Sequence, residues 1–268
     1  MALPTYEIFA LRYARHERMR HHNFLPYDVH DDAPMPMDYF VWAIRGEQGT
    51  ILVDTGFNEA AAKKRGRVLL LSPAEALEKL GVKRDEVTTS IITHLHYDHA
   101  GNLDLFPNAT FHLQDEEMAF ATGRHMCEHV FAQSFNVEDV LFMVKSVFAG
   151  RVKFHKGDAE VWPGVTVHRV GGHTDGLQIV RVNTGRGWVV LASDATHYYQ
   201  NIRRRSPYPT VFNIGDMMQG YHICERLADS PDHIVPGHDP EVLRLYPKLD
   251  IVGLEAVALH LPPKSQAE

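Results

Sequence analysis

The chain has 268 residues, of which 44% are apolar and 23% charged, and its net charge is −7. These values are typical of a globular protein, and the lack of any apolar run of about 18 residues predicts no membrane span. The acidic balance argues against a nucleic-acid partner, because a phosphate backbone requires an extended basic face. The one dense basic run, Arg203 to Arg205, suits a solvated loop or a contact with an acidic substrate group.

The first residues, MALPTYEIFALRYARHE, lack a basic start followed by an apolar stretch and a small-residue cleavage site, so we expect a cytoplasmic protein. The two cysteines, Cys127 and Cys224, lie far apart and predict neither a disulfide framework nor a thiolate zinc site. Because no repeat, low-complexity segment or Gly/Ser linker occurs, residues 1–268 are expected to form a single domain.

The first third of the chain predicts strands at 6–14, 38–46 and 50–56, the last two joined by the turn GEQG. Residues 15–37 are rich in Pro, Met and His and show no periodicity, so we expect a long lid or binding loop. Its apolar residues would form a wall for an acyl or aromatic substituent, or pack in a lid or a homodimer interface. These residues are Met19, Phe24, Tyr27, Met35 and Met37.

A helix is predicted over 72–81, where Ser72, Pro73 and Glu75 form a start signal and Gly81 a stop signal. The remaining expected elements are strands at 88–93 and 109–113, helices around 114–121 and 137–150, strands near 151–155, 165–170, 177–183 and 187–193, a helix near 216–229 and a strand at 233–235. Strands in hairpin-like series interleaved with helices, in two similar halves, predict two mixed sheets packed face to face with helices outside, a four-layer αβ/βα arrangement.

The segment THLHYDHAGN, which follows the strand at 88–93, contains His94, His96, Asp98 and His99. Imidazole nitrogen and carboxylate oxygen are ligands preferred by zinc and similar divalent ions. Side chains alternate along an extended segment, so His94, His96 and Asp98 would face one way, and a bend at Asp98 could turn His99 towards a neighbouring position. The spacing therefore allows two adjacent metal ions.

Four residues cannot fill two coordination spheres, and three more candidates occur downstream. His173 lies in VGGHTDG, Asp194 ends WVVLASD, and His238 lies in IVPGHD. Each follows a β-branched run, and both histidines are preceded by glycine, which permits the sharp turn that aims a side chain out of a sheet.

In this order, from about residue 51 to 239, these residues resemble the metallo-β-lactamase superfamily. The resemblance implies that His94, His96 and His173 hold one metal ion, and that Asp98, His99 and His238 hold the second. It implies that Asp194 bridges the two ions. Asp54 in ILVDTG matches the superfamily's structural aspartate, which orients a ligand histidine.

Two adjacent metal ions acidify a bridging water and polarise a carbonyl or phosphoryl oxygen, so the implied chemistry is hydrolysis. Asp98 would bind one ion, accept a hydrogen bond from the bridging hydroxide and pass a proton to the leaving group. The phrases ILVDTGF, THLHYDHAGN and SDAT resemble the quorum-quenching N-acyl homoserine lactonases. That resemblance implies attack of the bridging hydroxide on a lactone ring, with zinc favoured by ligand softness.

One position departs from the lactonase pattern. Lactonases usually carry Asp-Ala-x-Tyr, whereas this chain reads DATHYY, which places His197 at the tyrosine position and Tyr198 after it. Either His197 takes over an electrophilic or acid role, or Tyr198 reaches in, or the substrate differs. An ester, thioester, amide or phosphotriester hydrolase on the same scaffold remains an alternative, as does a non-catalytic metal-binding sensor. Asp175 also replaces the usual proline in HTDG, without a functional interpretation.

Overall fold

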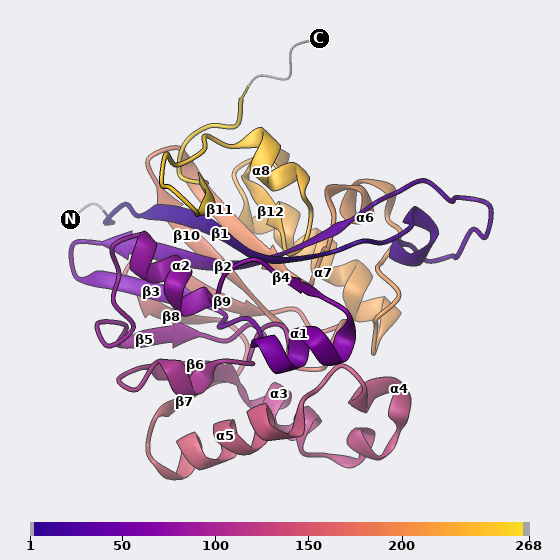
Figure 1. The fold of residues 1–268 in the computed structure, drawn as a ribbon, viewed down its shortest axis with the longest axis horizontal. Coiled ribbons are helices and arrows are strands. Elements are labelled where there is room, and N and C mark those ends of the chain that lie inside the picture. The colour runs from indigo at the N-terminus through magenta and orange to yellow at the C-terminus, as the bar shows by residue number, and fades with distance from the viewer. Residues whose placement is uncertain (1–2, 265–268) are drawn as a thin grey trace.

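Two mixed β-sheets form the centre of the computed structural model, which describes residues 3–264 (Figure 1). The larger sheet has eight strands in the order β13-β1-β2-β3-β5-β6-β7, and β4 pairs with β1 beside this path. Its strands are β1 (Glu7–His16), β2 (Met37–Gly46), β3 (Gly49–Val53), β4 (Val68–Leu69), β5 (Thr89–Ile91), β6 (Thr110–Gln114), β7 (Val152–His155) and β13 (Glu255–Ala258). The smaller sheet has the order β12-β11-β10-β9-β8. Its strands are β8 (Ala159–Trp162), β9 (Val165–Arg169), β10 (Gln178–Thr184), β11 (Gly187–Ser193) and β12 (Ile234–Pro236).

The central strands β1, β2 and β3 of the larger sheet carry apolar side chains on both faces, and the alternation of side chains assigns each residue to one layer. In β2, Phe40 and Trp42 pack between the two sheets, against β10 and β11. Tyr39 and Val41 point the other way, into the core beneath the outer helices. Because both faces are buried, β1 and β2 read as nearly continuous apolar runs rather than as an alternation of apolar and polar residues.

Helices cover the outer face of each sheet. The α-helices are α1 (Glu59–Arg65), α2 (Pro73–Lys79), α3 (Asp115–Ala121), α4 (His129–Ala132), α5 (Val137–Phe148), α6 (Tyr199–Arg204), α7 (Ile214–Leu227) and α8 (Glu241–Leu245). Short 3-10 helices span Arg20–Asn23, Leu103–Leu105, Arg124–Cys127 and Pro231–His233. Helices α2, α3 and α5 pack on the larger sheet, and α7 packs on the smaller one. The predicted four-layer αβ/βα arrangement is therefore confirmed.

Most predicted elements are present with boundaries shifted by one to three residues. The expected helix at 72–81 is α2, and its capping box forms as expected, with the Ser72 N–H donating to Glu75 Oε2 at 3.1 Å. The elements that the sequence did not predict are α1, β4, β8, α4, α6, α8 and β13. They are short, and β13 exists because it pairs with β1 from the opposite end of the chain, a contact that local patterns do not encode.

The segment 15–37, expected as a long loop, continues β1 as far as His16 and then folds back on itself. Its two arms are joined by backbone bonds, such as Met35 N–H to Arg18 O at 2.8 Å. Its far end is tied to the region after α6, since Leu25 N–H donates to Pro207 O at 2.8 Å. In Figure 1 this segment projects beside α6.

Within residues 3–264, no helix combines the length and the apolar character needed to cross a bilayer.

Four strand ends converge on one edge of the two sheets. The segments after β5, β9, β11 and β12 carry the predicted histidines and Asp194 to this edge. Two residues there have positive φ without being glycine, Asp54 at 60° and Ser193 at 45°. Such backbone is costly and tends to occur at functional sites.

Candidate metal centre

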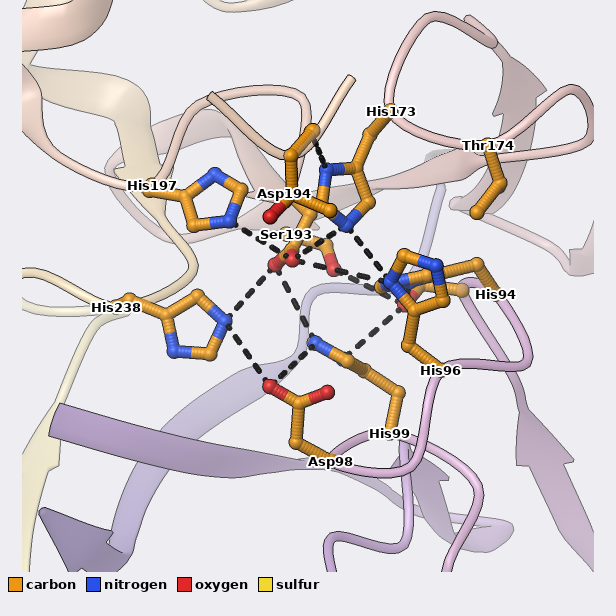
Figure 2. A network of polar contacts seen from close by, with 12 residues as sticks. His94, His96, Asp98, His99, His173, Thr174, Ser193, Asp194, His197 and His238 are labelled. Carbon is orange, nitrogen blue, oxygen red and sulfur yellow. Dashed lines mark hydrogen bonds and ion pairs between the residues drawn. The ribbon is translucent and has the colours of Figure 1, made fainter. Parts of the chain in front are cut away.

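The structure brings all seven predicted metal-ligating side chains together in a buried cluster (Figure 2). Each group in the cluster has ligand atoms within 4.8 Å of one another. The groups are His94, His96, His173 and Asp194; Asp98, His99 and His238; and Asp194, His197 and His238. The first two groups correspond to the two ion sites implied by the sequence resemblance.

Asp194 lies between the two groups, and each of its oxygens faces a different one (Figure 2). Oδ2 is 3.1 Å from His173 Nε2, whereas Oδ1 is 3.0 Å from His238 Nε2 and 3.3 Å from His99 Nε2. Asp194 therefore contacts both groups of candidate ligands at once. Asp98 Oδ2 lies 3.8 Å from His99 Nε2, at the open side of the second group.

The outward nitrogens of the histidines are held by fixed acceptors. His99 Nδ1 lies 2.7 Å from Asp54 Oδ2, His173 Nδ1 lies 2.6 Å from Thr210 O, and His238 Nδ1 lies 2.8 Å from Asp38 O. An acceptor at Nδ1 places the proton there, which leaves the Nε2 lone pair directed at the centre. The expected contact between Asp54 and a histidine of the cluster is thereby confirmed.

The inward atoms fit divalent metal ions. His94 Nε2 is buried without a hydrogen-bond partner among the described residues, and His99 Nε2 and Asp194 Oδ1 face each other at 3.3 Å without hydrogen-bond geometry. His96 Nδ1 and His173 Nε2 face each other at 2.9 Å. Orphaned buried polar atoms and converging lone pairs are costly unless a cation satisfies them. The donor set, imidazole with carboxylate, is the one that zinc and similar ions prefer.

The electrostatics favour the metal-binding form at three of the ligands, whereas at His99 and His238 burial lowers the pKa but the charge of Asp194 foremost raises it above the usual value. Burial, reinforced by neighbouring histidines, lowers the pKa of His94 and of His96 well below the usual range, so both stay neutral. Burial alone would raise the pKa of Asp194, but His197 and His238 foremost hold it well below its ordinary value. A neutral imidazole and an ionised carboxylate are the forms that bind metal ions.

Glu117 in α3 ties the two ligand loops together, and sequence patterns did not indicate it. Its buried carboxylate accepts hydrogen bonds from Leu95 N–H at 2.8 Å, between two ligand histidines, and from the Thr174 hydroxyl at 2.6 Å, next to His173. Burial raises the pKa of Glu117 to about 6 despite these hydrogen bonds. The side chain therefore fixes the distance between two segments that are far apart in sequence.

His197 lies at the centre, as one of the residues predicted to act in catalysis. Its Nε2 is 3.1 Å from Asp194 Oδ2, and its ring stacks on Tyr208 with centroids 3.7 Å apart and planes 9° from parallel. Burial lowers the pKa of His197 to about 3, so the ring is neutral.

Tyr208 lines the cavity above the centre, whereas Tyr198 does not. The Tyr198 ring is fully buried, and its hydroxyl donates to Pro36 O at 3.3 Å, away from the cavity. Burial raises the pKa of Tyr208 to about 12, so its hydroxyl keeps its proton. Tyr208 was not identified from the sequence, because it reaches the site from a loop between two prolines and no motif marks it.

Two adjoining cavities open above the metal centre. The first, of about 230 Å³, is polar, and Met37 is the one aliphatic hydrophobic side chain among the described residues that line it. Its lining is Arg18, Met37, Tyr39, Arg65, Arg67, His96, Tyr97, Asp98, Gln133, Ser134, His173, Asp194, His197, Tyr208, Thr210 and His238. The second, of about 270 Å³, shares His96 and His173 with the first and is apolar on its far side. That side consists of Phe120, Val130, Phe131, Pro209 and Val211.

The segment 15–37 does not form an apolar wall of either cavity, and only two of its residues line the first cavity. Met37 lines the cavity, but Met19, Phe24, Tyr27 and Met35 line neither cavity. The other contribution from this segment is Arg18. The basic run Arg203 to Arg205 lines neither cavity, and Arg205 pairs with Glu225 at 2.7 Å.

Adjacent His/Asp ligand groups at one edge of the sheets, with a cavity above them, fit a metal-dependent hydrolase. The chain belongs to the metallo-beta-lactamase superfamily, whose family model matches residues 35–245.

The chain is similar to two kinds of curated relative. It is 26% identical over 231 residues to a probable metallo-hydrolase of Mycobacterium tuberculosis. The matched region covers 76% of this chain and 72% of the relative. It is 30% identical over 189 residues to an N-acyl homoserine lactonase of a Bacillus species, which covers 64% of this chain and 70% of the relative. A solved quorum-quenching N-acyl homoserine lactone lactonase has the same fold, with a TM-score of 0.75, 23% identity, and coverage of 90% of this chain and 95% of its own.

Proposed function

We propose that this enzyme is a dinuclear metal-dependent hydrolase that opens the ester bond of a lactone. The observation that carries the proposal is the position of Asp194, with one carboxylate oxygen facing each of two groups of histidines. The similarity to N-acyl homoserine lactonases supports an ester bond in a small cyclic substrate as the target. We assign zinc as the metal on the basis of the donor set.

Two divalent ions held by these residues would acidify water and polarise a substrate carbonyl. In the hydrolysis of a lactone, a water oxygen bonds to the carbonyl carbon, the ring C–O bond breaks, and a hydroxy acid results. Asp98 lines the cavity beside His99 and His238, and its carboxylate is 12% exposed. It can therefore accept the proton of the water and deliver it to the leaving alkoxide.

Two further side chains complete the proposed site. The Tyr208 hydroxyl keeps its proton and lines the cavity, so it can donate a hydrogen bond to the oxygen that gains charge during ring opening. His197 lies against both Asp194 and Tyr208, and we assign it the role of positioning these two groups. Tyr208 would then supply the hydroxyl that the lactonase pattern places at the position of His197.

The test combines metal analysis with a pH-indicator assay on simple γ- and δ-lactones and on short- and long-chain acyl homoserine lactones. We expect about two metal ions per chain and ring opening that Asp98→Asn abolishes. Asp250→Asn, which changes an exposed carboxylate outside both cavities, is the matched control and should keep full activity. Two bound ions with no lactone opened would overturn the proposal.

The same assay separates the remaining alternatives. Turnover of acyclic esters, thioesters, amides or phosphotriesters, with lactones left intact, would assign another hydrolase activity to the same centre. A protein that holds two ions and hydrolyses no member of the panel would instead fit a metal-binding sensor.

A further inference from the structure

Three arginines, Arg18, Arg65 and Arg67, line the cavity above the metal centre, and we call them the arginine wall. Arg18 lies in the segment after β1, and Arg65 is the last residue of α1. Gly66 ends this helix with φ of 65°, a left-handed conformation that glycine adopts without strain. Arg67 then leads into β4, whose pairing with β1 brings it close to His16 and Arg18.

Each guanidinium is held by neutral acceptors. Arg18 donates to Asn23 Oδ1 at 2.8 Å and to His22 O at 2.7 Å. Arg65 donates to Gln133 O at 2.8 Å and lies 3.8 Å from the ring centroid of Tyr97. Arg67 donates to Arg65 O at 2.6 Å and to the Tyr97 hydroxyl at 3.2 Å. These contacts fix the three side chains without neutralising their charge.

No carboxylate among residues 3–264 forms an ion pair with any arginine of the wall. Other arginines of the chain are paired, for example Arg12 with Asp38 at 3.0 Å and Arg169 with Asp175 at 2.8 Å. The chain has more acidic than basic residues, so carboxylates are not scarce. Asp98 and Asp194 line the same cavity, but neither forms an ion pair with the wall, and three half-buried guanidinium groups there indicate that the cavity receives an anion.

The neighbouring histidine reports the same positive potential. Burial lowers the pKa of His16 to about 4, and the charges of Arg67 and Arg18 add to this effect. His16 Nε2 lies 3.2 Å from Arg67 Nη1, so a neutral His16 accepts a hydrogen bond from the arginine. A positive wall beside a polar cavity attracts anions and concentrates them at the site.

We propose that the arginine wall binds a carboxylate of the substrate, next to the ester bond that the metal centre cleaves. This inference rests on the proposed function, and it specifies the substrate as an anionic lactone rather than an uncharged one. A carboxylate suits the wall because the planar guanidinium forms paired, charge-assisted hydrogen bonds with planar oxyanions. A substrate phosphate would use the same donors, and the experiment distinguishes the two anions.

The experiment compares γ-butyrolactones that carry a carboxylate, a phosphonate or an uncharged carboxamide on the ring carbon next to the ring oxygen. In the metal-loaded enzyme we expect kcat/KM for the carboxylate to exceed that for the carboxamide by about 10- to 100-fold, the range for a charge-assisted hydrogen-bonded pair. Most of the difference should lie in KM, because the wall contacts a group that does not react. Greater activity on the phosphonate would assign the wall to a phosphate-like anion and overturn the carboxylate proposal.

Variants test whether the arginines cause the preference. Arg67→Met and Arg18→Met should each lower the carboxylate-to-carboxamide ratio at least about fivefold with unchanged metal content, whereas Arg67→Lys should keep part of it. Arg226→Met removes an exposed arginine of α7 outside both cavities and should leave the ratio unchanged. Equal activity on carboxylate and carboxamide in the unmodified enzyme would overturn the inference and leave the proposed function standing.

A binding measurement separates failure of the inference from failure of the proposed function. Cyclopentanecarboxylate, which has no ester bond, should bind the metal-loaded protein more tightly than cyclopentanecarboxamide in calorimetry. Binding that weakens in both methionine variants would support the wall even if no lactone were opened. Binding that persists unchanged in both variants would place the anion on the metal ions and overturn the inference.

Discussion

Five of the seven metal-centre residues line the same cavity as the arginine wall, but the two sets of residues stand on different kinds of backbone. The metal-centre residues follow strand ends, all but Asp98 are buried, and His99, His173 and His238 have their outer nitrogens fixed by carbonyl or carboxylate oxygens. The wall lies on a loop, a helix end and the residue before a two-residue strand, and it is only half-buried. The comparison teaches that the groups proposed to break the bond follow the ends of sheet strands, whereas the groups proposed to select the substrate stand on a loop, a helix end and a short strand.

The strongest test of this division is Asp194→Asn. The change removes the carboxylate that lies between the two histidine groups, so metal content should fall well below two ions per chain. Activity on every substrate should drop by about 1,000-fold or more, since several kcal/mol of transition-state stabilisation depend on the ions. Metal analysis and kcat/KM measure the two effects. A variant with full metal content and full activity would remove Asp194 from the centre.

The next test compares two tyrosines. Tyr208→Phe should lower kcat about 100-fold, the usual cost of one donor to a developing negative charge, while metal content stays unchanged. Tyr198→Phe is the matched control, because its hydroxyl contacts Pro36 O outside the cavity, and kcat should stay within about threefold. The reverse order of effects would assign the catalytic hydroxyl to Tyr198 instead.

A third test concerns the support beneath the centre. Asp54 accepts hydrogen bonds from the Thr93 N–H and hydroxyl and lies against His99 Nδ1. Asp54→Asn should weaken metal affinity about 10- to 100-fold, as loss of a ligand's outer partner typically does. A competition titration with a metal-binding dye measures the affinity, and the melting temperature of the metal-free protein shows whether the fold is kept. Unchanged affinity in a folded variant would contradict the role given to Asp54.

The smallest expected effect is on the pKa of His16, which lies next to Arg67 of the wall. The pKa of His16 is lowered to about 4, chiefly by burial and then by Arg67. Arg67→Met should raise this pKa but leave it below 6.5, because burial remains. In the unmodified protein the free energy of unfolding should decrease as the pH falls from 6.5 towards 4, since the unfolded chain binds the proton more readily. NMR titration measures the pKa of His16, with Arg226→Met as the control variant. An unchanged pKa in Arg67→Met would contradict an effect of the Arg67 charge on His16.

The sequence located the residues of the candidate metal centre but not those of the wall, for a physical reason. His94, His96, Asp98 and His99 occupy one segment after a strand, and each later candidate follows its own apolar strand, so local patterns locate them. Their grouping in space follows once the strands of two sheets end at the same edge. The fold layers were predictable for the same reason, because alternation and caps are local signals.

The wall could not be predicted from local patterns. In the sequence, Arg18, Arg65 and Arg67 look like ordinary solvated charges, and they become a cluster only through the pairing of β4 with β1. Tyr208 and Glu117 likewise reach the site through contacts between distant segments. The short elements α1 and β13 were missed because their stability comes from packing and strand pairing rather than from their own residues.

The end of α1 at Gly66 determines the direction in which Arg65 and Arg67 point, and therefore bears on the proposed binding of a substrate carboxylate. Residues two apart in an α-helix point about 200° from each other, so a helix continuing through residue 67 could not aim both Arg65 and Arg67 into one cavity. The left-handed turn at Gly66 cancels this divergence. If the wall binds a carboxylate as proposed, a variant whose first helix runs one turn further should keep the metal-centre residues in place and lose its preference for negatively charged lactones.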